Sequence, residues 1–135
     1  MKKLLLGIAA VCLAGFTFAQ DAPLWMRHSV ISPDGTTIAF TYKGDIYTVP
    51  VAGGRAMQIT TNPAYDTAPV WSPDSKRIAF ASDRMGSLDV YIVAKDGGEP
   101  RRLTTHSGSE TPLAFTDAGH VLFSAGIMPS AENKT

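Results

Sequence analysis

The sequence has few residues that could support covalent chemistry or nucleic-acid binding. It contains a single cysteine, Cys12, which lies within an apolar N-terminal run. The rest of the chain therefore has no disulfide, no thiolate metal site and no cysteine nucleophile. Basic and acidic side chains balance at 12 each, and charged residues make up 18% of the chain. This composition excludes a disordered polyelectrolyte and argues against a nucleic-acid partner.

Long hydrophobic runs are also absent, except at the N-terminus. Two lysines precede an almost uninterrupted apolar stretch over residues 4–18, and small residues follow as far as Ala19. This run is short for a transmembrane helix and is typical of an export signal, while a buried helix or a membrane anchor is the alternative. We therefore predict that residues 1–19 are a signal peptide cleaved after Ala19. The product would be periplasmic or secreted, without membrane contact after cleavage.

The strongest feature of the sequence is internal repetition, which is typical of stacked structural units. The nine residues that begin at Ser32 match those that begin at Ser72, forty residues later, at six positions. Three further segments recur at a spacing of forty-four residues: 45–49 as 89–93, 53–54 as 97–98 and 59–61 as 103–105. A third copy starts at residues 115–123 and then stops.

Each repeat is predicted to form four short β-strands. In the first repeat they lie around residues 30–31, at 38–40, at 46–49 and at 57–60, and the second repeat ends with the matching strand 101–104. The middle strands are apolar on both faces, which is typical of sheets packed between other sheets. The fourth strand is more polar, so we expect it to be outermost. No window has helical periodicity with caps.

A four-stranded unit of this length predicts a propeller blade. The predicted fold is all-β, with four-stranded antiparallel blades, two complete and a third begun. Residues 20–135 would form this partial β-propeller, with repeats at about 24–66, 67–110 and an incomplete 111–135. Small residues at Ala39 and Ala79 would let neighbouring blades approach closely.

The turns between the first and second strands follow the same pattern. Pro33 presets the backbone of a type I turn, and Gly35 accepts the left-handed conformation that closes it. Ser75 takes the place of Gly35 in the second repeat. A left-handed serine is strained, so we expect some backbone strain there.

These motifs carry a resemblance to a known group. Ser-Pro-Asp-Gly with Ile-Ala-Phe, then Ser-Asp-Arg, Asp-Val-Tyr, Gly-Gly and Arg-Arg-Leu-Thr, resembles the WD40-like propeller repeat of exported bacterial proteins. That repeat occurs in the Tol–Pal propeller protein, in prolyl-oligopeptidase-type peptidases and in tricorn protease. Residues 24–28 and 53–60 are most similar to the N-terminus of exported tricorn-like serine peptidases, and the resemblance covers residues 24–128.

The tricorn-like resemblance implies a propeller that serves substrate access or protein interaction. It also implies a PDZ-type module and a C-terminal serine-peptidase core that holds the catalytic serine, its histidine and the oxyanion-hole donors. No position here matches that motif, and the chain has no Gly-x-Ser-x-Gly elbow. We therefore predict no catalytic residue, no cofactor site or cofactor, and no metal site in this chain. The parent protein would be a serine peptidase.

Several other residues have a possible functional role and a structural alternative. A calcium loop at residues 83–89 has too few carboxylates, and a hairpin loop in which Asp83 caps the turn and pairs with Arg84 or its neighbours is favoured. Asn133 begins a glycosylation sequon that we expect to be idle. Trp25 and Trp71 are interpreted as blade-packing residues. A histidine–serine nucleophile pair is disfavoured for His28, His106 and His120 with Ser29, Ser107 and Ser109.

We expect the chain to be part of a longer polypeptide, because the third repeat stops after Ser124. Its partners would be further blades, PDZ-like and peptidase modules, and a peptide or protein. A Tol–Pal-like periplasmic protein-binding propeller is one alternative. The propeller of another hydrolase, such as an amidohydrolase or a prolyl-oligopeptidase type, is the other. Alone, the chain would expose apolar sheet faces and aggregate or remain partly unfolded.

Overall fold

The computed structural model describes residues 25–126 as β-strands joined by turns and short connections. The ten strands of this part are β1 Met26–Ile31, β2 Thr37–Tyr42, β3 Asp45–Pro50, β4 Met57–Gln58, β5 Asp66–Trp71, β6 Arg77–Ser82, β7 Asp89–Ala94, β8 Arg101–Arg102, β9 Glu110–Phe115 and β10 Val121–Ala125. These residues include no helix that could cross a membrane. The predicted signal peptide and the sequon at Asn133 lie outside the described residues.

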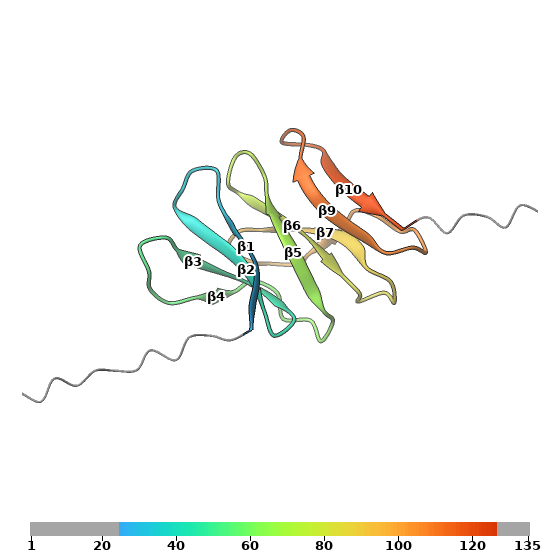
Figure 1. Cartoon of the computed structure of the whole chain (residues 1–135), viewed down its shortest axis with the longest axis horizontal. Helices are drawn as coiled ribbons and strands as arrows, with labels where there is room; N and C mark the ends of the chain where they lie inside the picture. Colours follow the sequence, from blue (N-terminus) through green and yellow to red (C-terminus); the bar gives the residue numbers. More distant parts are fainter. Residues whose placement is uncertain (1–24, 127–135) are drawn as a thin grey trace, which may run out of the picture.

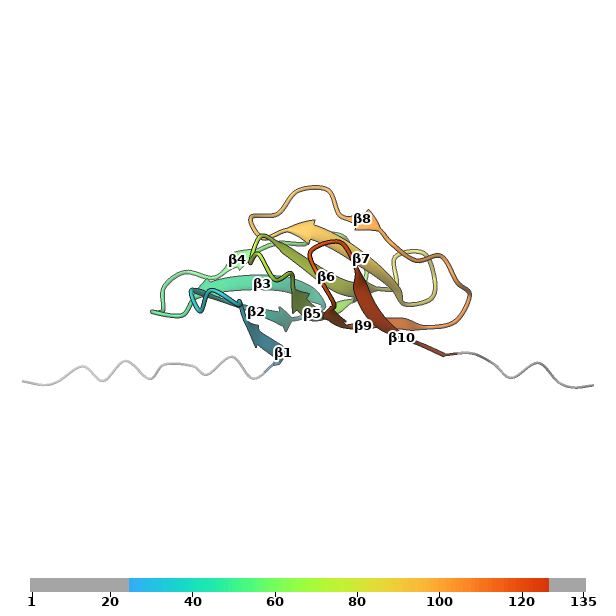
Figure 2. The ribbon, with the colours of Figure 1, turned by 90° about the horizontal axis from the view of Figure 1, so that it is seen from above.

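The strands form three antiparallel sheets. The first sheet has the order β1-β2-β3-β4, the second has the order β5-β6-β7-β8, and β9 pairs with β10 in the third. The sheets follow one another like blades along the chain (Figure 1). Seen from above, β1, β5 and β9 lie toward one side and β4 and β8 toward the other (Figure 2). The predicted all-β fold, with two four-stranded blades and a third begun, is confirmed.

The fourth strands are shorter than predicted. β4 and β8 contain two residues each, whereas the sequence predicted four. The reason is the threonine that follows each strand. Thr60 Oγ1 accepts the hydrogen bond of the Ile46 backbone N–H at 3.0 Å, and Thr104 Oγ1 accepts that of Val90 at 2.9 Å. A side chain thus replaces the main-chain acceptor, and the ladder ends there.

The Ser-Pro-Asp turns adopt the conformations that the sequence predicted. Gly35 has a φ of 71°, and Ser75 at the matching position has a φ of 57°. Ser32 Oγ donates to the Asp34 carboxylate at 2.5 Å. This bond, followed by those from the Thr36 backbone and side chain, lowers the pKa of Asp34. Ser75 Oγ also accepts the Asp34 N–H at 3.1 Å, which links the turns of the first two sheets.

The first strand of each complete sheet carries a β-bulge at the same place. The pairing of β1 with β2 shifts between Arg27 and Val30, and the pairing of β5 with β6 shifts forty residues later. His28 and Ala68 each have a φ of 51° within these bulges. Because a bulge bends a strand and increases its twist, the repeated bulge gives both sheets the same shape.

The core lies between the sheets. Its cluster of buried residues comprises Ala39, Ile46, Ile59, Trp71, Ile78, Phe80, Tyr91 and Val93. Ala39 and Ala79 are both 0% exposed, in agreement with the predicted close approach of blades. The middle strands β6 and β7 are buried along almost their whole length, because the second sheet has a neighbour on each side.

Candidate functional site

One end of the second sheet holds a buried group of charged and polar side chains. Asp66, Ser82 and Asp89 stand beside one another on β5, β6 and β7, because Asp66 pairs with Ser82 and Ser82 with Asp89 in the strand register. All three residues are 0% exposed. Buried carboxylates are strongly destabilising unless they are paired. Two arginines provide that pairing.

Arg84, from the loop after β6, is held by four neighbours. Its Nη2 donates to both carboxylate oxygens of Asp66, at 3.2 and 3.1 Å, and its Nε donates to Ser82 Oγ at 2.9 Å. The guanidinium carbon lies 4.5 Å from the ring centroid of Tyr91 and 5.6 Å from that of Phe80. A planar guanidinium suits both kinds of contact. Its orientation is therefore fixed.

Arg102 pairs with the other buried carboxylate. Its Nη2 donates to Asp89 Oδ2 at 2.7 Å. Among the described residues, Asp89 Oδ1 and Glu110 Oε2 are buried without a hydrogen-bond partner. Burial also raises the pKa of Tyr91, which makes its phenol a poorer acid. The group stabilises charge inside the sheet.

Asp83 was predicted to cap its turn and to pair with Arg84 or its neighbours, and its side chain does not pair with Arg84. Asp83 Oδ1 instead accepts the backbone N–H of Tyr65 at 2.8 Å, and the Asp83 carbonyl accepts the N–H of Gly86 at 2.8 Å. Arg84 turns away to Asp66, because that carboxylate is buried and needs a counter-charge. Asp83 thus ties its loop to the connection between the first two sheets.

The three histidines have separate partners. His28 Nδ1 lies 3.2 Å from Thr67 Oγ1, His106 Nδ1 accepts the N–H of Gly108 at 3.1 Å, and His120 Nδ1 lies 2.8 Å from Asp117 Oδ2. None of the hydrogen bonds among the described residues joins one of these histidines to Ser29, Ser107 or Ser109.

The carboxylates of the 83–89 stretch also point to separate partners, namely Tyr65 for Asp83 and Arg102 for Asp89. Within residues 25–126, no three histidine, cysteine or acidic side chains gather into a metal-binding group. Trp71 packs as predicted, with its Nε1 donating to the Val30 carbonyl at 3.1 Å. Trp25 does not: it lies directly before β1 and is 62% exposed.

A hollow of about 440 Å³ lies along the first strands of the three sheets. We call it the inner-strand face. It is lined by Val30, Ile31, Pro33, Val70, Trp71, Pro73, Leu113, Ala114 and Phe115. Each sheet contributes three of these residues: the first two sheets from their first strand and the turn that follows it, and the third sheet from β9 alone. Ile31 and Leu113 are 58% and 55% exposed, so the face presents apolar surface to solvent. This surface could not be predicted from the sequence, because its residues come from three repeats that are far apart in the chain.

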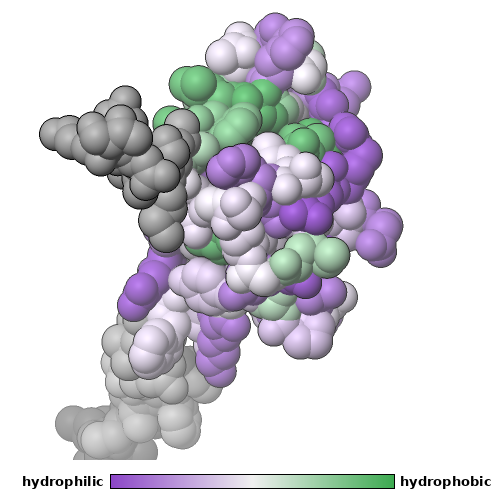
Figure 3. Space-filling view, turned by 90° about the vertical axis from the view of Figure 1, so that its right-hand side faces the viewer, coloured by the Kyte–Doolittle hydropathy of each residue, from purple (hydrophilic) through white to green (hydrophobic). Residues whose placement is uncertain are grey.

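The third sheet presents further apolar surface. Leu122 and Phe123 of β10 are 52% and 39% exposed. Figure 3 views the molecule from this side and shows hydrophobic surface interrupted by polar side chains. This sheet has two strands within the described residues and packs against the second sheet. Such surface is typical of a face that another structural unit covers.

Comparison with known proteins identifies the group to which these sheets belong. Residues 23–134 match the family described as the tricorn protease N-terminal β-propeller domain. The chain belongs to this family. It is 35% identical over 102 residues to tricorn protease homolog 1 of Streptomyces coelicolor, covering 75% of the chain and 9% of that protein. It is 30% identical over 129 residues to the uncharacterized peptidase YuxL of Bacillus subtilis, covering 94% of the chain and 20% of that protein.

A solved structure supports the fold. The crystal structure of TolB from Acinetobacter baumannii superimposes with a TM-score of 0.64 at 23% identity, covering 74% of the chain and 26% of TolB. The resemblance to tricorn-like peptidases and to TolB propellers is thus confirmed. The chain spans between about a tenth and a fifth of the length of the two peptidase relatives.

Proposed function

We propose that this chain is the propeller segment of an exported tricorn-like serine peptidase and carries none of its chemistry. In this proposal the inner-strand face guides or docks peptide on its way to a catalytic core elsewhere in the polypeptide. The observation that carries the proposal is the apolar hollow along β1, β5 and β9 in a chain of the tricorn propeller family. Apolar contacts are non-directional, so such a wall accepts peptides of many sequences.

The test is an inner-face substitution in the full-length protein. Leu113→Asp places a charge on the exposed wall, so we expect cleavage of unfolded peptides to fall several-fold in kcat/KM. Met85→Asp is the matched control, because Met85 is also exposed, at 65%, and lies in the loop between β6 and β7. If both variants fold and cleave peptide equally well, the inner-strand face has no role in peptide cleavage.

The structural likeness to TolB favours a second function, in which the same face binds a protein partner without proteolysis. The activity of the full-length protein separates the two. Peptide cleavage that requires a serine outside this chain supports the peptidase. A full-length protein that cleaves no peptide but retains a partner, and loses it on Leu113→Asp, supports the binding propeller.

We also propose that residues 1–19 direct export and are removed after Ala19, on the basis of two lysines, an apolar run and small terminal residues. Cell fractionation with N-terminal sequencing tests this directly. We expect a periplasmic or secreted product that begins at or near Gln20. A cytoplasmic product that retains Met1 would contradict it.

A further inference from the structure

A second pocket lies between the first and second sheets, away from the inner-strand face. It has a volume of about 280 Å³, room for roughly nine water molecules at about 30 Å³ each. One wall is the connection after β4, and the other is the segment before β8. We call it the inter-sheet slot. Its lining residues are Ile59, Thr60, Thr61, Asn62, Pro63, Arg84, Gly98, Glu99 and Pro100.

The slot contains a guanidinium that is already oriented. Arg84 uses Nε and Nη2 for Ser82 and Asp66, and its side chain is 12% exposed. Within the described residues no hydrogen bond engages its Nη1. A donor fixed before binding loses little conformational freedom when a ligand arrives. Because Asp66 offsets its charge, this donor suits a neutral acceptor such as a peptide carbonyl better than an anion.

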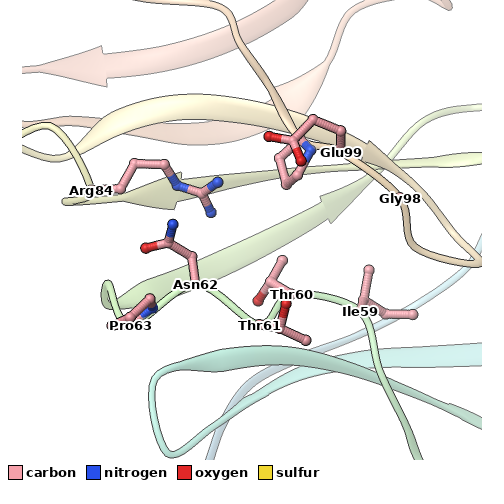
Figure 4. Close-up of a pocket in the computed structure, with 9 residues that line it drawn as sticks. Ile59, Thr60, Thr61, Asn62, Pro63, Arg84, Gly98 and Glu99 are labelled. Atoms are coloured by element: carbon pink, nitrogen blue, oxygen red, sulfur yellow. The ribbon is translucent and has the colours of Figure 1, made fainter.

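Two further polar groups converge on the same space (Figure 4). Asn62 Oδ1 accepts the N–H of Ala64 at 3.0 Å, which holds the carboxamide and leaves its amino group for a ligand. The carboxylate of Glu99 lies on the opposite wall and has no ion-pair partner among the described residues. With Arg84 balanced by Asp66, Glu99 leaves the slot with a net negative charge.

We propose that the inter-sheet slot binds a short peptide segment with a basic side chain. Peptide carbonyl oxygens accept hydrogen bonds from Arg84 Nη1 and Asn62 Nδ2, and the ammonium or guanidinium of the ligand faces Glu99. Pro63 and Pro100 supply apolar contact for the remaining backbone. The volume of about 280 Å³ suits a ligand of about the size of a dipeptide. This site is separate from the inner-strand face and does not depend on it.

Ligand-observed saturation-transfer NMR on the full-length protein tests the proposal with two probes, acetyl-Gly-Lys-amide and acetyl-Gly-Glu-amide. We expect the lysine peptide to bind with a Kd in the millimolar range and about threefold more tightly than the glutamate peptide. Glu99→Gln should remove that preference. Asn62→Ser keeps an oxygen for the Ala64 N–H but loses the amino group, so it should weaken both peptides equally.

The repeat supplies matched controls. Arg55 and His106 occupy the positions of Glu99 and Asn62 in the preceding and following copies, forty-four residues away, and neither lines the slot. Arg55→Gln and His106→Ser should leave both affinities unchanged. The proposal is overturned if neither peptide binds, or if the control variants change the two affinities as much as Glu99→Gln and Asn62→Ser do. Binding that survives Leu113→Asp would confirm that the slot acts independently of the inner-strand face.

Discussion

The first and second sheets have the same backbone but different polar ends. Both stack a phenylalanine on a tyrosine across the middle strands, with ring centroids 5.8 Å apart for Phe40 and Tyr47 and 6.0 Å apart for Phe80 and Tyr91. At the polar end, Asp45 accepts a hydrogen bond from the neutral Gln58 at 3.0 Å. The matching carboxylate in the second sheet, Asp89, is paired with the charged Arg102.

The difference follows from burial. The second sheet lies between two others, and its carboxylates Asp66 and Asp89 are 0% exposed, so each takes an arginine. Among the described residues, the first sheet has a neighbouring sheet on one side, and Met26 stands in the position of Asp66. The turns and the apolar strands are thus common to both copies. Whether a copy contains buried ion pairs depends on how much of its sheet is covered by neighbouring sheets.

The variant with the largest expected effect on stability is Arg84→Met. The substitution keeps the apolar stem over Tyr91 and leaves Asp66 as an uncompensated buried charge. We expect a loss of about 3–5 kcal/mol in the free energy of unfolding, measured with urea. The control is Lys43→Met in the corresponding loop of the first sheet, where the amine lies 5.3 Å from the Tyr42 ring centroid at the surface. It should cost about 0.5 kcal/mol. Equal losses would show that burial does not separate the two copies.

The next test exchanges the partners of the matched aspartates. Arg102→Gln gives the second sheet the neutral donor of the first, and we expect it to cost about 1.5 kcal/mol, since the Arg102 side chain is 30% exposed. Gln58→Arg makes the reverse change beside Asp45 and should cost nothing or stabilise slightly. Urea unfolding of both variants measures the effect. A loss on Gln58→Arg as large as that on Arg102→Gln would contradict the role assigned to burial.

The local parts of the fold could be predicted because each depends on a short stretch of sequence. The Ser-Pro-Asp turns, the strained Ser75 and the repeated middle strands all follow from neighbouring residues. The strand ends at Thr60 and Thr104 were missed, because a side-chain hydroxyl took the place of a main-chain carbonyl.

The partners within the polar group could not be predicted, because Arg84 and Asp66 are eighteen residues apart in the sequence and only the strand register brings them together. One signal was available: acidic residues stand at both 66 and 110, forty-four residues apart. An acidic residue that recurs at the first position of the first strand indicates a carboxylate that is buried in the sheet. The inter-sheet slot left no such signal, since Asn62 and Glu99 come from different copies.

A smaller effect is expected at the turns. Gly35 has a φ of 71°, and a Cβ added there would meet nothing within 4 Å. Gly35→Ala therefore imposes only the backbone strain that Ser75 already carries in the second sheet, and we expect a loss of about 1 kcal/mol. Thermal or urea unfolding measures it. A neutral result would show that the left-handed turn position tolerates side chains in both copies.

The smallest effect concerns pH and Asp45. Burial raises the pKa of Asp45 above its ordinary value of 3.8, and the nearby Asp66 carboxylate raises it further. The folded state therefore holds this proton more tightly than the unfolded state, so the carboxylate destabilises the fold at neutral pH. That penalty is relieved as pH falls through the folded pKa toward 3.8.

Asp45→Asn should remove this dependence, so the stability difference between variant and parent should change with pH above 3.8. Asp74 is the control of opposite sign, because hydrogen bonds from Ser72 and then the Lys76 backbone lower its pKa. Its contribution is present above 3.8 and is lost only as pH falls below that value. Urea unfolding of the parent, Asp45→Asn and Asp74→Asn across the acid range separates the two windows. If the Asp45→Asn difference is independent of pH, the carboxylate of the first sheet is solvated, and its neutral partner Gln58 needs no explanation from burial.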